Sequence, residues 1–300
     1  MRLFLFFLSL SVGALAHTDL SKTVAALSAK IEEHPTAELY FQRALEYRAL
    51  REKDHTIEDL RRALELKPRF RDAKFALAEG LGASDEALKL ALELASGPAN
   101  LRTAYPATLL LIRVHRLRGE YEEALKWSQS LDEMTREVRR EDAELDLLHA
   151  GILLDLKRPT EAATVLKEAW QRSKSIVARN NWIDAALTVG QAKEVLPLIE
   201  TELRSSRLRS SWLIRRARAL LILEREKAAR ADLLSALVEI QGRLNPKQPD
   251  LTLIADRGLI HALTGNLALA RRDLAFLRKT TLPPSAYRLL TAALGTAQAE

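Results

Sequence analysis

Residue types that commonly carry out catalysis or hold metals are sparse in this sequence of 300 residues. There are no cysteines, which excludes disulfides and zinc–thiolate sites. No two histidines lie four residues apart and none is part of an HExxH motif, and P-loop, GxSxG and GxGxxG motifs are absent. We therefore predict no metal, no cofactor and no catalytic activity. The six histidines are His17, His34, His55, His115, His149 and His261.

Arginine and aspartate recur together at a fixed spacing of 16 residues. The planar guanidinium of arginine can hold a carboxylate through two hydrogen bonds. We therefore predict that each pair forms a structural clamp across one helical hairpin; the alternative is a row of arginines that bind a ligand. The pairs are Arg43/Asp59, Arg216/Asp232 and Arg257/Asp273, and the same two positions elsewhere hold Leu111/Trp127, His149/Val165 and Trp182/Leu198.

The composition indicates which elements must position these residues. Hydrophobic residues make up 47% of the chain and charged residues 29%, whereas aromatic residues make up only 5%. Leu, Ala, Arg and Glu dominate and are strong helix formers, so we predict an all-α protein of one or two domains. The net charge of +6 comes from basic residues interleaved with acidic ones. Because nucleic-acid binders usually cluster their basic residues, no nucleic-acid partner is predicted.

The N-terminus reads MRLFLFFLSLSVGALA over residues 1–16. Arg2 is followed by an apolar stretch at residues 3–12, and Ala14 and Ala16 are the small residues that a signal peptidase reads. A membrane anchor is the alternative, but the stretch is shorter than the roughly 20 helical residues that span a bilayer. We therefore predict a signal peptide cleaved after Ala16, export to the periplasm or outside the cell, and no membrane span after cleavage.

The remainder of the chain repeats a hairpin of two amphipathic helices. In residues 37–68, apolar residues recur with helical spacing on both sides of a polar stretch at residues 51–55. A single hairpin of this kind cannot bury its apolar face, so copies must stack. Gly119, Gly190 and Gly265 mark tight turns between the two helices. Small residues in the second helix, 31 to 41 residues apart, define seven units: Thr56, Ala87, Ala124, Ala162, Val195, Ala229 and Ala270.

At these positions the sequence resembles the tetratricopeptide repeat (TPR) family. The first unit matches the family pattern through Tyr40, Ala44, Tyr47, Leu60, Ala63 and Pro68. The resemblance implies an all-α, right-handed α-solenoid of about seven TPR-like hairpins, with capping helices at both ends. The predicted segments are a signal peptide (residues 1–16), an N-terminal capping helix (17–34), the repeat domain (35–280) and a C-terminal capping helix and tail (281–300).

The resemblance also implies a binding groove lined by the first helix of each hairpin, helix A. The groove would be apolar with several arginines, and would suit a protein or peptide partner with an acidic side chain or a free carboxylate. Alternatively, the arginines only solvate this face. The carboxylate clamp of chaperone-binding family members is absent, since only Asn180 matches it. The implied groove residues are Phe41, Leu45, Arg48, Leu109, Arg113, Arg116, Asn180, Asp184, Leu187, Ile214, Arg218 and Leu221.

These observations predict a non-catalytic protein–protein interaction scaffold in the cell envelope or outside the cell. The alternative is an adaptor that binds a glycan or peptidoglycan polymer. That function would be supported by exposed aromatic platforms, for which the four tryptophans are candidates: Trp127, Trp170, Trp182 and Trp212.

Overall fold

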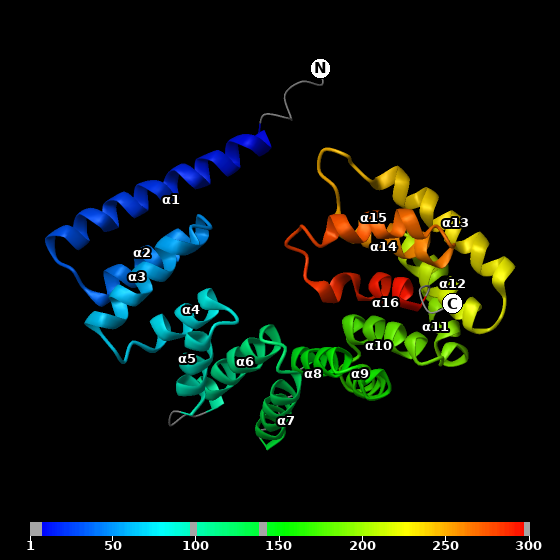
Figure 1. The fold of residues 1–300 in the computed structure, drawn as a ribbon, viewed down its shortest axis with the longest axis horizontal. Coiled ribbons are helices and arrows are strands. Elements are labelled where there is room, and N and C mark those ends of the chain that lie inside the picture. Colours follow the sequence, from blue (N-terminus) through cyan, green and yellow to red (C-terminus); the bar gives the residue numbers. More distant parts are fainter. Residues whose placement is uncertain (1–7, 97–100, 138–142, 297–300) are drawn as a thin grey trace. The chain divides into compact units, whose positions relative to one another are not determined.

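The computed structural model describes residues 8–96, 101–137 and 143–296, and these form sixteen α-helices and one 3₁₀ turn without any β-strand (Figure 1). The all-α fold, a TPR-like array of helix pairs, agrees with the prediction. Helix α1 (Leu8–Glu33) precedes seven pairs, each a helix A and a helix B: α2 (Ala37–Ala49) and α3 (Lys53–Leu66), α4 (Arg71–Leu81) and α5 (Asp85–Ala95), α6 (Leu101–Leu117) and α7 (Tyr121–Glu137), α8 (Ala143–Asp155) and α9 (Pro159–Ser173), α10 (Ile176–Thr188) and α11 (Ala192–Ser205), α12 (Ser210–Ile222) and α13 (Glu226–Arg243), α14 (Leu251–Leu263) and α15 (Leu267–Leu277).

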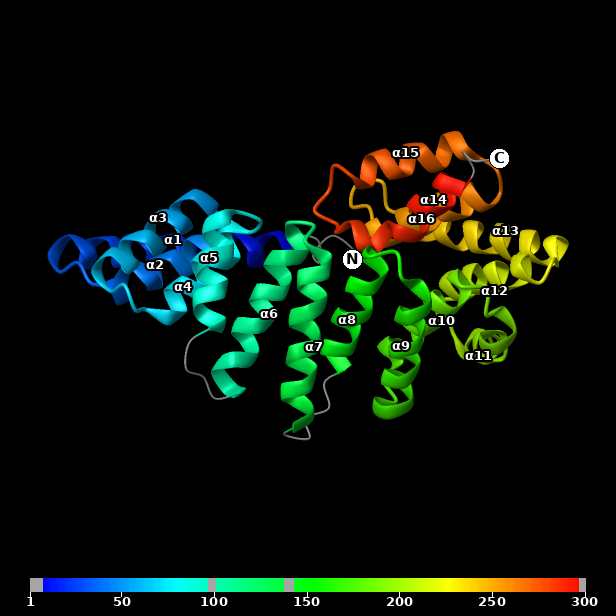
Figure 2. The same ribbon diagram turned by 60° about the horizontal axis from the view of Figure 1, so that its bottom comes forward.

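The chain divides into two compact units. The N-terminal unit, Met1–Lys157, contains α1 to α8, and the C-terminal unit, Arg158–Glu300, contains α9 to α15 followed by a 3₁₀ turn (Pro284–Tyr287) and α16 (Arg288–Thr296). Figure 2 shows the helices of each unit from a second direction.

Every turn from helix A to helix B is three residues long and contains one residue with positive φ. The amide after that residue often reaches back five residues, as from Gln191 to the Ala186 carbonyl at 2.9 Å, which closes the helix end. Glycine adopts positive φ without steric cost, so the prediction for Gly119, Gly190 and Gly265 is confirmed. The seven residues are Arg51, Gly82, Gly119, Lys157, Gly190, Glu224 and Gly265.

The small residues that define the repeat are all buried. Each is at most 6% exposed, as expected where helix B packs closely against its neighbours. Branched aliphatic residues fill the remaining core, among them Leu60 and Leu111 in the N-terminal unit and Ile183 and Ile260 in the C-terminal unit. Packing of small against branched residues therefore fixes the helix pairs, as the repeat pattern predicts.

Helix α1 packs on α2 through the buried side chains of Leu27 and Ile31. It begins at Leu8, earlier than the residue 17 at which the capping helix was expected to begin. Residues 1–7 of the predicted signal peptide lie outside the described residues, and residues 8–16 form the first turns of α1.

The C-terminal cap covers the last hairpin. Helix α16 packs on α14 and α15, and its Leu290 and Leu294 are buried. The close fit depends on Gly258 of α14, because a β-carbon there would lie 2.7 Å from Leu290 Cδ2. Across the part of the chain that the structure describes, no helix is both long enough and apolar enough to cross a membrane.

Candidate functional site

The three arginine–aspartate pairs lie in direct contact within their hairpins. In each pair Nε and Nη2 of the arginine donate to the two carboxylate oxygens at distances of 2.6–2.9 Å. These hydrogen bonds raise the pKa of all three arginines. The contacts join helix A to helix B in each hairpin, as expected for structural clamps. The pairs are Arg43 with Asp59, Arg216 with Asp232, and Arg257 with Asp273.

The carboxylates of these clamps belong to the core and not to an accessible surface. Asp59 is 3% exposed, Asp232 6% and Asp273 5%. Both oxygens of Asp232 accept hydrogen bonds from Arg216 at 2.7 Å, so no room is left for a ligand at this carboxylate. The alternative of a row of arginines that offer their forks to a ligand disagrees with this geometry. Asp232 is thus a buried residue that holds α13 against α12, as the clamp prediction expects.

In hairpins whose first clamp position holds Leu111 or Trp182 instead of arginine, apolar packing replaces the ion pair. Leu111 is fully buried and Trp127 packs against its cluster. Trp182 is 2% exposed and stacks on Trp170, with ring centroids 5.0 Å apart. The clamp position is therefore a packing position in both versions.

The arginines expected on the groove side of the N-terminal unit reach carboxylates on the neighbouring helix A. Arg116 of α6 binds Asp155 of α8, with Nη2 2.6 Å from Oδ2. The other two contacts are looser: Arg48 Nη1 lies 3.5 Å from Glu79, and Arg113 Nη2 lies 4.0 Å from Glu144. More than half of the side chains of Arg48 and Arg113 is exposed, at 55% and 53%. Their charges are therefore available at the surface.

In the C-terminal unit the corresponding contact is closed. Asp184 of α10 accepts hydrogen bonds from Arg215 Nη2 at 2.7 Å and from Arg218 Nη1 at 2.6 Å, both on α12. The Arg218 side chain is only 10% exposed, and burial lowers its pKa while Asp184 opposes that change. Sequence reasoning missed Arg215, although it stands three residues from Arg218, on the same side of α12.

The apolar groove residues divide into two groups. Phe41, Leu45, Leu109 and Leu221 are half-buried. Leu187 and Ile214 are only 4% exposed, so their expected place on an accessible groove surface is wrong. Both side chains are core residues, because α10 and α12 pack directly on each other. Asn180 is half-buried, and its Oδ1 has no hydrogen-bond partner among the described residues.

A further carboxylate lies near Asp184 that the sequence analysis did not identify. Asp256 of α14 is partly buried and forms no hydrogen bond or ion pair with the residues that the structure describes. Burial raises its pKa to about 6, the nearby charge of Arg215 lowers it, and that of Asp184 raises it. We call Asp184, Arg215, Arg218 and Asp256 the charge cluster. No sequence pattern identifies Asp256, because the charged residues near it, Arg215 and Asp184, belong to other hairpins.

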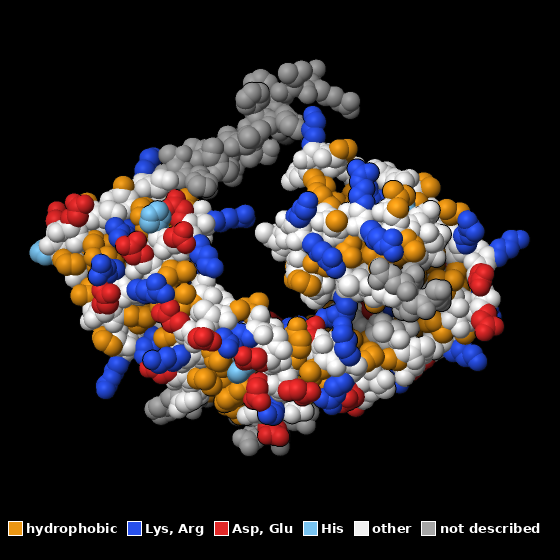
Figure 3. All heavy atoms as spheres, in the orientation of Figure 1, with side chains coloured by type: hydrophobic (Ala, Val, Ile, Leu, Met, Phe, Trp, Pro, Cys, Tyr) orange, Lys and Arg blue, Asp and Glu red, His pale blue; other side chains and the backbone are white. Residues whose placement is uncertain are grey.

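The other candidate chemistry is limited. Over the described ranges, no group of three or more His, Asp or Glu residues is placed to hold a metal. His115 is buried and bonds Glu120 at 2.7 Å. On the face drawn in Figure 3, acidic and basic side chains are interspersed on the N-terminal unit, whereas the charged side chains of the C-terminal unit are mostly Lys and Arg. Trp182 and Trp212 are buried and the other two tryptophans are half-buried, so none of the four offers the exposed platform that polymer binding would need.

Comparison with known proteins agrees with the observed fold. The tetratricopeptide-repeat family profile matches residues 37–70, which comprise the α2–α3 hairpin. A tetratricopeptide repeat protein from Parabacteroides merdae aligns with a TM-score of 0.62 at 16% identity, covering 87% of this chain and 98% of that one. This chain has the tetratricopeptide-repeat fold. The TPR fold suggests a protein–protein interaction scaffold, and proteins of this kind are generally non-catalytic.

Two further TPR structures match less closely. YrrB, described as a TPR protein with an unusual peptide-binding site, aligns at 15% identity and a TM-score of 0.35, covering 83% of this chain and 98% of YrrB. A TPR protein from Thermus thermophilus aligns at 22% identity and a TM-score of 0.38, covering 62% of this chain and all of that one. Among curated protein sequences, none matches this chain.

Proposed function

We propose that this TPR protein is an exported, non-catalytic scaffold that binds a protein or peptide across the helix A surface of its N-terminal unit. The observation that carries the proposal is the exposure of Arg48 and Arg113. Both belong to helix A and make only loose ion pairs. Exposed pairs at such distances contribute about 0–1 kcal/mol, so a partner can replace the carboxylate at little cost.

Apolar side chains accompany these arginines at helical spacing. Phe41, Leu45 and Arg48 stand at i, i+4 and i+7 on α2, and therefore share one face. Leu109 and Arg113 stand at i and i+4 on α6. The surface thus offers half-buried apolar groups beside two exposed, loosely paired arginines. Its matching partner carries an apolar anchor and an acidic side chain or terminal carboxylate.

The proposal is tested with a charge reversal and a matched control. Cross-linking in the native envelope fraction identifies partners, and the affinity of each purified partner is then measured. We expect Arg48→Glu/Arg113→Glu to weaken binding at least tenfold. The control, Arg69→Glu/Lys89→Glu, changes the same charge at exposed sites of the same unit that form no ion pair among the described residues. Equal affinity of both variants for the partner would contradict the proposed surface.

Export is tested separately. The pattern of residues 1–16 supports cleavage after Ala16, so the mature chain should begin at His17. Mass spectrometry of the protein from periplasmic and medium fractions measures this N-terminus. Recovery of only the uncleaved chain, in the cytosolic fraction, would refute export.

A further inference from the structure

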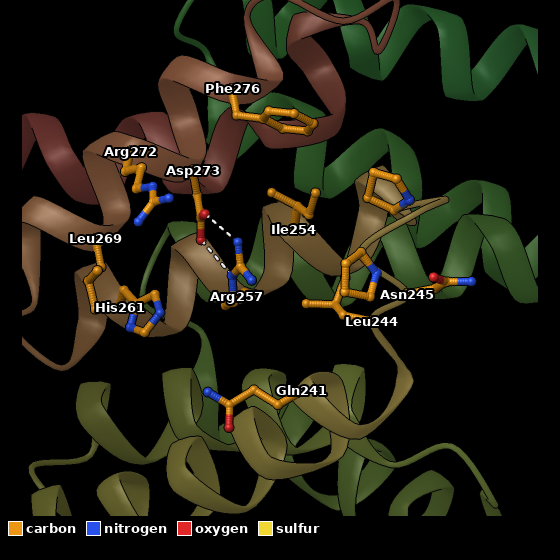
Figure 4. Close-up of a pocket in the computed structure, with 12 residues that line it drawn as sticks. Gln241, Leu244, Asn245, Ile254, Arg257, His261, Leu269, Arg272, Asp273 and Phe276 are labelled. Atoms are coloured by element: carbon orange, nitrogen blue, oxygen red, sulfur yellow. Dashed lines mark hydrogen bonds and ion pairs between the residues drawn. The ribbon is translucent and has the colours of Figure 1, made fainter.

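A pocket of about 520 Å³ lies in the C-terminal unit, and its lining includes none of the charge cluster residues (Figure 4). It is bounded by the end of α13, the connection at residues 244–250 and the α14–α15 hairpin. Its walls are mainly apolar and include Leu244, Ile254, Leu269 and Phe276. This volume falls within the range of about 300–1,000 Å³ that is usual for ligand pockets.

The pocket lies beside the clamp of the α14–α15 hairpin, which the preceding helix, α13, does not cover. In the first hairpin, α1 packs on the clamp, and Arg43 Nη1 donates to Ser28 Oγ of α1 at 2.8 Å. Only residues 34–36 link α1 to α2, whereas residues 244–250 link α13 to α14. The longer link, with two prolines, borders the pocket. The Arg257 side chain is 31% exposed, close to the 30% of Arg216 and more than the 18% of Arg43, whose clamp α1 covers.

Polar groups of the pocket are left with unused hydrogen-bonding capacity. Arg257 uses Nε and Nη2 to bind Asp273, and its Nη1 bonds no residue that the structure describes. His261 is 8% exposed, and its buried Nδ1 has no hydrogen-bond partner among the described residues. Burial lowers the pKa of His261, which keeps the ring neutral. Figure 4 shows the Arg257 guanidinium in the middle of the pocket, between His261 and Ile254.

The charge of the lining is positive. The lining contains two arginines, Arg257 and Arg272, and one carboxylate, Asp273. Both oxygens of Asp273 already accept hydrogen bonds from Arg257. Arg272 is exposed and forms no ion pair within the described part of the chain. An anionic group is therefore the complement that the pocket lacks.

Exposed apolar side chains extend from both walls. On α15, Leu269 and Phe276 are 45% and 43% exposed and stand on either side of Arg272 in the sequence. On α13, Leu234 and Val238 are 52% and 70% exposed, and they lie two turns and one turn before Gln241, which lines the pocket. A chain seated in the pocket can therefore continue along α13.

We propose that this pocket is a second binding site, for a peptide segment in which a bulky apolar side chain stands next to a carboxylate. The apolar side chain fills the space between Leu244, Ile254 and Phe276. The carboxylate accepts hydrogen bonds from Arg257 Nη1 and from Arg272. The site goes beyond the helix A surface proposed above, because it uses other residues in the other unit.

The test uses a defined probe on the full chain. N-acetyl-Leu-Phe-Glu-amide is titrated against ¹⁵N-labelled protein and followed by NMR, with N-acetyl-Leu-Phe-Gln-amide as the uncharged control. We expect saturable shifts at Phe276 and at the ring nitrogens of His261, and at least fivefold weaker binding of the control peptide. Equal binding of the two peptides, or no shift at His261, would overturn the proposal.

Matched variants locate the site. Arg272→Glu and Phe276→Ala change exposed side chains of the pocket and should each weaken the probe at least fivefold. Arg271→Glu makes the same charge change on the preceding residue of α15, which does not line the pocket, and should change affinity less than twofold. Equal losses for Arg271→Glu and Arg272→Glu would show general charge attraction and refute the site. Loss of probe binding in Arg48→Glu/Arg113→Glu, with the pocket variants unaffected, would place the probe on helix A instead and also refute it.

Discussion

Helix A arginines differ in availability, most clearly between Arg48 and Arg113 of the N-terminal unit and Arg215 and Arg218 of the C-terminal unit. In the N-terminal unit, Arg48 and Arg113 are more than half exposed and lie 3.5 and 4.0 Å from their carboxylates. In the C-terminal unit, Arg215 and Arg218 share Asp184 at 2.6–2.7 Å and are less than one fifth exposed. Arg116 of the N-terminal unit, with Nη2 2.6 Å from Asp155, is bound as closely as these two. The same kind of pair is thus an open contact at Arg48 and Arg113 and a structural element at Arg116, Arg215 and Arg218. Burial, and not residue type, decides which arginines remain free for a partner.

The largest effect should separate the two kinds of pair. Asp184→Ala leaves two largely buried guanidinium groups without their carboxylate, and loss of one partner of such a pair costs about 3–5 kcal/mol. Glu79→Ala removes an exposed partner and should cost less than about 1 kcal/mol. Urea unfolding followed by circular dichroism measures both. Equal losses in the two variants would remove the distinction between the units.

A second prediction concerns Asp256, whose pKa is raised to about 6 from an ordinary 3.8. Because the folded state holds this proton more tightly, the contribution of the group to stability is full below pH 3.8 and is lost as the pH rises through 6. Asp256→Asn should therefore be more stable than the parent by about 3 kcal/mol at pH 7.5, and nearly equal to it at pH 3.5.

The pH dependence of that difference is measured by urea unfolding at several pH values. Glu168→Gln, an exposed change in the same unit, is the control and should show no trend. A difference between Asp256→Asn and the parent that stays constant from pH 3.5 to 7.5 would contradict the assigned burial of this carboxyl.

The smallest effects should be alike in both units. Arg51 and Glu224 adopt positive φ at equivalent turns, with values of 63° and 59°. Replacing either by glycine relieves backbone strain but increases the entropy of the unfolded chain, so we expect a gain below about 1 kcal/mol. Gly119→Ala, at the same turn position, should lose about 1 kcal/mol. Thermal unfolding measures these changes, and a loss in both glycine variants would show that the turns are not strained.

Local features of the fold were predictable, and features that depend on stacking were not. The contact of Arg43 with Asp59 follows from sequence because a three-residue turn fixes the register of the two helices in a hairpin. The contact of Arg218 with Asp184 joins residues 34 apart on different hairpins and depends on how those hairpins pack. For the same reason Leu187 and Ile214 were expected at the surface although α10 and α12 bury them. Asp256 escaped notice because its neighbours come from other helices.

The constant three-residue turn from helix A to helix B has a consequence for how this chain can change during evolution. The links from helix B to the next helix A vary from two to seven residues. Length therefore varies between hairpins and not at the turns within them. The longest link is also the one that borders the 520 Å³ pocket. In an array of this kind, new cavities arise at the joints between modules, where added residues separate two hairpins without disturbing the packing inside either.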